Sequence, residues 1–155
     1  MNNLTFEQFN NAQFKLFKGN PILKNPLDSF VIADPSVLTP DVSHDGKWHL
    51  FCHTFFGVYR YASADGINFK NMGKIVNRAM RPNINYIDGK YYLSWVCHTD
   101  RGTSIGIAVT EDFINWDRKE NAVLPVSRNG VLFPRKVNDE YMIFTPGYSL
   151  TAQKK

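Results

Sequence analysis

The sequence predicts an all-β fold built from repeated four-stranded modules, and three observations predict it. Residues 31–69 and residues 78–116 read nearly alike, at an offset of about 43 to 47 residues. A third copy begins at Val131. Aromatic residues make up 14% of the chain, and aromatic side chains favour strands over helices. A repeat period in the forties that consists of short strands indicates the blades of a β-propeller.

Composition and charge indicate a soluble globular protein of 155 residues, 43% of them hydrophobic and 21% charged. The net charge is +4, but the lysines and arginines are scattered, so we expect no nucleic-acid partner. No apolar run approaches the ~20 residues of a membrane span, and residues 1–17 lack the apolar core of a signal peptide. The two cysteines are therefore expected to be free thiols in a cytoplasmic setting.

Residues 1–29 are an N-terminal segment, in which residues 4–17 fit either a short helix or an edge strand. The first module covers residues 30–76. Its second strand alternates Trp48, Leu50 and Cys52 with a second set of apolar or aromatic residues, as a strand packed on both faces would. Strands are expected at residues 30–38, 47–54, 57–63 and 68–72.

The second module, residues 77–125, repeats this order. We expect strands at residues 83–87, 90–98, 103–110 and 115–118, with tight Asp-Gly turns such as the one at Asp88-Gly89 between them. The third module, residues 126–155, supplies only two strands, at residues 130–137 and 140–146. The chain is thus predicted to be a single partial propeller domain of about two and a half blades.

A propeller closes into a ring so that no blade is left with a bare face. Half a ring exposes the apolar side of its last blade and unpaired strand edges. We therefore expect a homo-oligomer, a second chain that completes the ring, or a longer protein of which this chain is a part. The sequence does not separate these alternatives.

Four stretches carry a resemblance to a known family: ADPSVL at 33–38, IDGKYYLSW at 87–95, residues 104–125, and GVLFPRKVNDEYMIF at 130–144. They resemble the five-bladed propeller glycosidases, above all the mannoside phosphorylase and mannosidase family. The arabinanase/xylosidase and invertase groups share the architecture. The resemblance implies an oligosaccharide substrate, with inorganic phosphate as a possible second substrate. It also implies carboxylates that project from the innermost strands and cleave a glycosidic bond.

The resemblance assigns roles to residues beside the proline of each first strand. Asp34 resembles the general base of the arabinanase-type enzymes. Arg81, in Met80-Arg81-Pro82-Asn83, stands where the mannoside phosphorylases carry the aspartate that donates the proton. Arg135 likewise replaces the glutamate of their Phe-Pro-Glu motif. Asp34 is therefore the predicted catalytic residue, Arg81, Asn83 and Arg135 are predicted to hold substrate, and the missing acid must come from elsewhere.

The tripeptide Cys-His-Thr occurs twice, at 52–54 and at 97–99. Two cysteines and two histidines suggest zinc, but adjacent residues on a strand face opposite ways, so blade duplication explains the pattern more simply. We expect no metal and no cofactor. His53 and His98 remain candidates for sugar contact, and Trp95 is a candidate for stacking on a sugar ring.

The sequence thus predicts a carbohydrate-active protein of the glycoside hydrolase or glycoside phosphorylase kind. The alternative from another class is a non-catalytic sugar-binding or degenerate propeller protein, in which Arg81 and Arg135 are ligand clamps or remnants. A third possibility is a truncated fragment without independent function. The sugar, the linkage, and the choice between hydrolysis and phosphorolysis stay open.

Overall fold

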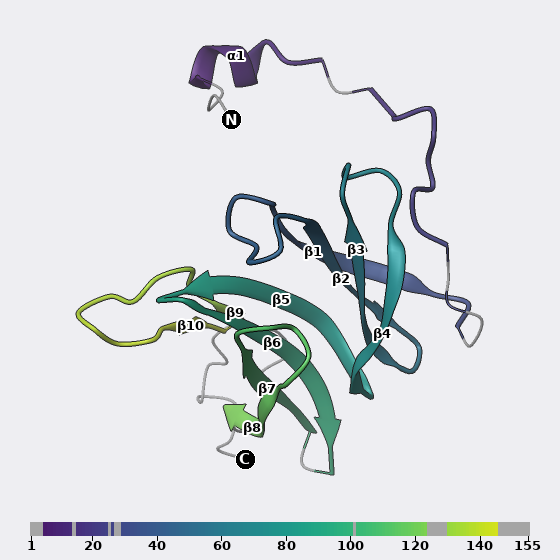
Figure 1. The fold of residues 1–155 in the computed structure, drawn as a ribbon. Coiled ribbons are helices and arrows are strands. Elements are labelled where there is room, and N and C mark those ends of the chain that lie inside the picture. Colours follow the sequence, from purple (N-terminus) through teal and green to yellow (C-terminus); the bar gives the residue numbers. More distant parts are fainter. Residues whose placement is uncertain are drawn as a thin grey trace, which may run out of the picture.

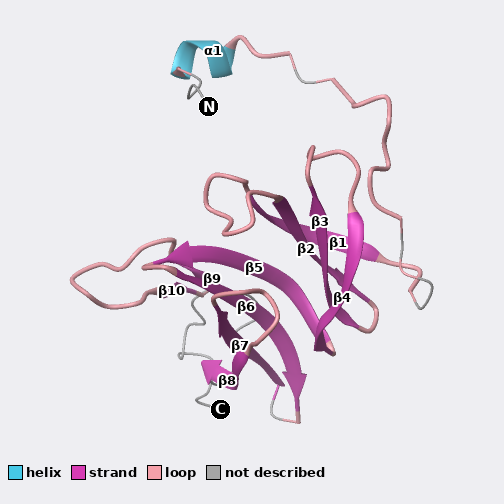
Figure 2. Ribbon diagram, viewed as in Figure 1, coloured by secondary structure: helices cyan, strands magenta, loops and turns pink. Residues whose placement is uncertain are grey.

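The computed structural model describes residues 5–13, 15–24, 26, 29–100, 102–123 and 130–145, and this part of the chain is almost entirely β (Figures 1 and 2). The one described helix, α1 (Phe6–Asn10), decides between the two structures left open for the N-terminal segment. It lies apart from the sheets, at the far end of an extended segment (Figure 1). None of the described helices is long and apolar enough to cross a membrane.

Two four-stranded antiparallel sheets follow each other along the chain, each with its strands in sequence order. We call them blade 1 and blade 2. The first strands of both blades, and of the short sheet that follows, are the innermost. Blade 1 consists of β1 (Ile32–Leu38), β2 (Trp48–Thr54), β3 (Gly57–Ser63) and β4 (Lys70–Asn77). Blade 2 consists of β5 (Ala79–Ile87), β6 (Lys90–Thr99), β7 (Gly102–Thr110) and β8 (Asp117–Val123). A two-stranded sheet pairs β9 (Val131–Leu132) with β10 (Ile143–Phe144).

The duplication is visible in the turn before the last strand of each blade. Oδ1 of Asp65 accepts hydrogen bonds from the backbone N–H groups of Ile67 and Asn68 at 2.9 and 2.8 Å. Oδ1 of Asp112 accepts the same pair of bonds from Ile114 and Asn115, both at 2.8 Å. These N–H groups, of Asn68 and Asn115 above all, hold the pKa of each carboxyl well below its usual range.

The core lies between the two blades, because β2 turns one of its faces toward blade 2. Phe51 on this face is fully buried in a cluster with Leu93 and Trp95 of blade 2. The opposite face of blade 1 carries Cys52, Tyr59 and Tyr61, and there Leu23 of the N-terminal segment packs against them. The expectation of a strand packed on both faces is therefore confirmed.

The first strands of successive modules lie side by side, as a radial arrangement requires (Figure 1). The backbone N–H of Ile84 on β5 donates to Oγ of Ser36 on β1 at 3.0 Å. Nδ2 of Asn85 on β5 donates to the carbonyl of Leu132 on β9 at 3.0 Å. Strands β1, β5 and β9 thus form the inner edge of a partial ring, and the predicted all-β propeller architecture is confirmed.

Candidate active site

A cavity of about 340 Å³ opens where the first strands of the three modules begin. Its lining combines one carboxylate, one guanidinium, one carboxamide and two prolines with the backbone that leads into β9. The lining residues are Asp34, Pro35, Arg81, Pro82, Asn83, Gly130 and Val131. Two of the modules therefore supply this cavity with side chains from equivalent positions.

Each of these positions is a break in the strand ladder. The register of β1 shifts between Ala33 and Ser36, and the register of β5 shifts between Met80 and Asn83. Within the breaks, Asp34 has φ 49° and Arg81 has φ 52°. Positive φ is unusual for residues other than glycine, asparagine and aspartate, and it persists only where the surrounding structure imposes it. Of the two, Arg81 is therefore the strained residue, and its place beside Asp34 in one cavity makes this a candidate site.

Two basic side chains approach the carboxylate of Asp34. Nδ1 of His53 lies 3.3 Å from Oδ2 of Asp34, although without the geometry of a hydrogen bond. Nε of Arg81 lies 4.0 Å from the same oxygen. The Asp34 side chain is 50% exposed and the Arg81 side chain is 51% exposed. The carboxylate is therefore flanked by two basic groups and still open to a ligand.

Asn83 lies two residues beyond Arg81 and is oriented by its neighbours. Its Oδ1 accepts a hydrogen bond from Nδ2 of Asn85 at 2.7 Å, and Asn85 is itself bonded to the carbonyl of Leu132. Because the oxygen of the Asn83 amide is used inside the protein, the nitrogen is the atom that remains to donate to a ligand.

The structure brings His53 to Asp34 but does not bring His98 there. In blade 1, Ala33 pairs with His53, whereas at the corresponding place in blade 2 Met80 pairs with Val96. The β6–β7 hairpin is longer, so His98 lies two residues further out, where it pairs with Thr103 and is exposed. The repeated tripeptide thus marks the end of each hairpin and not an equivalent place in the site.

Two further candidates lie outside the cavity. Trp95 is 1% exposed, and a Cβ built on Gly106 would stand 2.3 Å from its ring, so the indole is enclosed in the core of the chain. Arg135 is exposed, with its guanidinium 5.7 Å from the centre of the Phe133 ring. Neither side chain lines the space beside Asp34.

Gly130 and Val131 complete the lining, and neither was predicted from the sequence as a site residue. A signal was present, since both lie just before the Phe-Pro pair of the third copy, at the place of a first strand. A Cβ at Gly130 would lie 2.0 Å from Cδ1 of the fully buried Ile105, so a larger residue there would have to displace that side chain.

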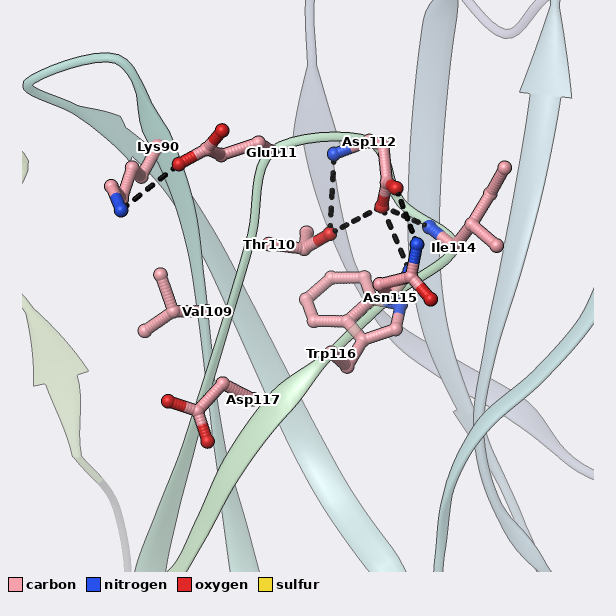
Figure 3. A pocket seen from close by; sticks show the side chains of 9 residues that line it. All are labelled: Lys90, Val109, Thr110, Glu111, Asp112, Ile114, Asn115, Trp116 and Asp117. Atoms are coloured by element: carbon pink, nitrogen blue, oxygen red, sulfur yellow. Dashed lines mark hydrogen bonds and ion pairs between the residues drawn. The ribbon is translucent and has the colours of Figure 1, made fainter.

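A larger hollow, of about 640 Å³, lies at the turn between β7 and β8 (Figure 3). Its polar groups bond to one another: Asp112 accepts from Thr110, Ile114 and Asn115, and Lys90 pairs with Glu111 at 2.9 Å. The hollow repeats the structural turn of blade 1, so we assign it no role. Among the described residues, no group of three or more His, Cys, Asp and Glu side chains is placed to hold a metal ion.

Fold and cavity define a class of architecture, a β-propeller in which the innermost strands of neighbouring blades present polar side chains to one cavity. Comparison with known proteins specifies the family. The beta-1,4-mannooligosaccharide phosphorylase family matches residues 62–153, and the chain belongs to this family. The resemblance stated from the sequence is thereby confirmed.

Individual relatives agree with this assignment. The chain is 41% identical over 64 residues to a beta-1,4-mannooligosaccharide phosphorylase of Ruminococcus albus, covering 41% of this chain and 19% of the relative. It is 32% identical over 134 residues to a 1,2-beta-oligomannan phosphorylase of Thermoanaerobacter, covering 71% of this chain and 45% of the relative. The solved beta-1,2-mannobiose phosphorylase of Listeria innocua has the same fold, with a TM-score of 0.67, 14% identity, and coverage of 86% of this chain and 58% of that one. The chain therefore spans less than two thirds of each relative.

Proposed function

We propose that this chain forms part of a carbohydrate-active site that binds a mannoside-type oligosaccharide and acts on its glycosidic bond. The observation that carries the proposal is the carboxylate of Asp34, held at the bulge of an innermost strand and half-exposed in a cavity shared by neighbouring modules. Family membership supports the choice of a saccharide as ligand.

In this proposal Asp34 is the catalytic base. Cleavage of an acetal requires a proton for the departing oxygen and a nucleophile that attacks from the opposite face. A carboxylate that is open to ligand can accept the proton of an attacking water. His53 and Arg81 lie beside the carboxylate of Asp34, and Arg81 and Asn83 hold the saccharide. Inorganic phosphate is the alternative nucleophile, and it needs no base because it is already an anion.

The second requirement, a proton donor, is met elsewhere. The second blade presents Arg81 at the position equivalent to Asp34, and a guanidinium does not donate a proton at neutral pH. We therefore propose that the acid comes from the part of the ring that this chain does not span, supplied by a second copy, by another chain or by further residues of a longer protein. Cys52 and Cys97 are reduced thiols, which is compatible with work in the cytoplasm.

The test is turnover by Asp34→Asn. Asparagine tolerates positive φ and keeps the shape of the side chain, so the fold is expected to persist. Hydrolytic release of sugar from aryl mannosides or manno-oligosaccharides is expected to fall about 100-fold or more, whereas release with phosphate, which needs no base, is expected to fall less. Asp117→Asn, on the outermost strand β8, is the matched control. Unchanged turnover in Asp34→Asn would remove Asp34 from the mechanism.

The presence of Arg81 favours a second candidate, a sugar-binding protein without turnover. In that case saccharides raise the melting temperature of the chain but are recovered uncleaved. Light scattering belongs to both experiments, because a species of twice the 17.8 kDa chain mass indicates two copies that complete each other's ring. Turnover by that species supports the enzyme, and ligand stabilisation without turnover supports the binding protein.

A further inference from the structure

We propose that a second cavity, between the two blades, binds a small tetrahedral oxyanion, either free phosphate or a phosphate ester, and that Arg60 is its main ligand. The cavity has a volume of about 510 Å³. Its walls come from the β1–β2 turn, β3 and β4 of blade 1, and from the turn before β8 of blade 2. It lies away from Asp34, because β1 runs from Asp34 toward the β1–β2 turn. The inference is therefore independent of the proposed function.

Arg60 on β3 is a buried cation that lacks a carboxylate partner. Its side chain belongs to a residue that is only 9% exposed. None of the ion pairs in the described part of the chain involves Arg60. Burial lowers the pKa of Arg60 below its ordinary value, although the charge of Asp45 acts against this. A buried charge without a close counter-ion is costly, so a ligand that supplies one is favoured.

The hydrogen bonds of the Arg60 guanidinium are also incomplete. A guanidinium has five N–H donors and no acceptor. Nη1 donates to Nδ1 of His49 at 3.3 Å, whereas Nε is buried and has no acceptor among the described residues. Cζ of Arg60 lies 5.2 Å from the centre of the Phe113 ring, which covers the guanidinium but accepts no bond in its plane. Further acceptors must therefore come from the cavity.

The two carboxylates beside this cavity are already engaged. Oδ1 of Asp45 accepts from Oγ of Ser43 at 2.7 Å and from Nε2 of His49 at 2.9 Å, and its Oδ2 lies 3.3 Å from Nζ of Lys47. The carboxylate of Asp112 bonds to residues of its own turn (Figure 3). Both carboxylates are thus held in place by other donors, and neither approaches Arg60 closely enough to pair with it.

The surroundings of Arg60 favour an oxyanion with several acceptor oxygens. Lys47 and Lys70, both exposed, line the same cavity, so three cationic side chains face two carboxylates and leave one positive charge. A tetrahedral oxyanion accepts hydrogen bonds from several directions and can reach the guanidinium and both ammonium groups together. A planar carboxylate matches the guanidinium alone. The volume of the cavity also leaves room for the organic group of a phosphate ester.

Titration calorimetry with the full chain tests the site. The probes are inorganic phosphate, glycerol 3-phosphate and neutral glycerol. We expect both phosphate compounds to bind and glycerol not to bind. Tighter binding of glycerol 3-phosphate than of inorganic phosphate identifies an ester as the ligand, and equal affinity identifies the free anion. Either result supports the oxyanion site.

Variants of the cavity assign the binding to its residues. Arg60→Gln removes the charge, and we expect the affinity for phosphate to fall about 10- to 100-fold, as the loss of charge-assisted hydrogen bonds implies. Because Arg60 is buried and its substitution can lower stability, Lys70→Glu at the exposed edge is the second variant, with an expected loss of about tenfold. Lys74→Glu is the matched control, since Lys74 lies on the same strand, is exposed and does not line the cavity.

Three results would overturn the proposal. The first is the absence of phosphate binding to the natural chain. The second is an equal loss of affinity in Lys70→Glu and Lys74→Glu, because the effect is then one of net charge only. The third is binding that survives Lys70→Glu but is lost in Arg81→Asn, which places the anion in the cavity of Asp34. None of these results bears on turnover by Asp34, so the proposed function is tested separately.

Discussion

The two blades share one backbone and differ in what it carries. Both innermost strands break their ladder before a proline, and the residue in the break has φ 49° in blade 1 and 52° in blade 2. Blade 1 places Asp34 there and blade 2 places Arg81. The conformation was duplicated together with the blade, whereas the charge was free to change. The repeat therefore explains where the candidate site lies, and the differences between the copies determine which charges line it.

The same comparison extends into the core. Trp95 of blade 2 lies opposite Gly106 on the neighbouring strand, and the corresponding pair in blade 1 is Cys52 opposite Tyr59. One blade has its large residue on the second strand, and the other has it on the third. In both blades one large and one small side chain fill the space beside these strands. The combined volume of the pair is therefore similar in the two blades, although the large residue lies on a different strand.

The largest expected effect comes from emptying this space. Trp95→Ala removes a fully buried indole, and we expect the free energy of unfolding to fall by about 3 to 5 kcal/mol. Urea denaturation of the two chains measures the loss. The comparison is sharpened by Gly106→Tyr, whose ring cannot coexist with Trp95, combined with Trp95→Cys to recreate the pair of blade 1. The double variant should lose less free energy of unfolding than the two single variants lose together. Strictly additive losses would show that the two positions do not compensate for each other's volume.

A smaller effect is expected at the turn before the last strand of each blade, where Gly66 of blade 1 corresponds to Phe113 of blade 2. Both have positive φ, 75° and 59°. The Phe113 ring lies 4.2 Å from the ring of Tyr91 and 4.5 Å from that of His49. In blade 2 the strained backbone at Phe113 is therefore offset by the packing of its ring, which fills the gap between the blades.

Phe113→Gly tests this balance. It relieves the strain but removes the ring, and we expect a net loss of about 2 to 4 kcal/mol in the free energy of unfolding. Phe113→Leu, which keeps both the strain and part of the volume, is the control and should lose less. A glycine variant as stable as the natural chain would show that the ring contributes little to blade packing.

Sequence alone located much of this architecture. Alternation marked the second and third strands of each blade almost to the residue, because both faces of these strands are packed. It missed the start of β5, expected at Asn83 and found at Ala79, since Pro82 reads as a break although the strand passes through it as a bulge. The third module contains shorter strands than expected, 131–132 and 143–144.

The site was predictable in part, because the repeat marks the same place in both modules. The repeated proline identified Asp34, Arg81 and Asn83, which the cavity brings together. Positive φ at an arginine could not be predicted, because it depends on tertiary packing and not on local preference. His98 was named from a repeated tripeptide, and only the ladder shows that its hairpin is longer.

We expect a modest effect of pH on stability at another pair of equivalent positions, which His49 occupies in blade 1 and Tyr92 occupies in blade 2. In blade 1, Nη1 of Arg60 donates to Nδ1 of His49 at 3.3 Å, and Nε2 of the same ring donates to Asp45 at 2.9 Å. Burial lowers the pKa of His49 below its ordinary 6.5 although Asp45 acts against this. Burial and the hydroxyl of Tyr141 raise the pKa of Tyr92 from 10.0 to about 12.

Both groups are neutral in the folded chain, so they act at opposite ends of the pH range. The unfolded chain takes up a proton at His49 more readily, and stability should therefore fall as the pH drops below about 6.5. The unfolded chain loses a proton at Tyr92 more readily, so stability should fall again as the pH rises from about 10 toward 12. Urea denaturation across this range measures both slopes. His49→Gln should flatten only the acid side and Tyr92→Phe only the alkaline side, and the reverse pattern would contradict the assignment.

The smallest expected effect concerns the two charges with which the comparison began. If Asp34 and Arg81 are kept for ligands and not for stability, the double-mutant cycle of Asp34→Asn and Arg81→Asn should give a coupling energy of less than about 1 kcal/mol, since the pair is long and half-exposed. The same four chains should differ far more in their affinity for a manno-oligosaccharide. A coupling of several kcal/mol would mean that the pair holds the blades together, and the strained backbone beneath each residue would then need no ligand to explain it.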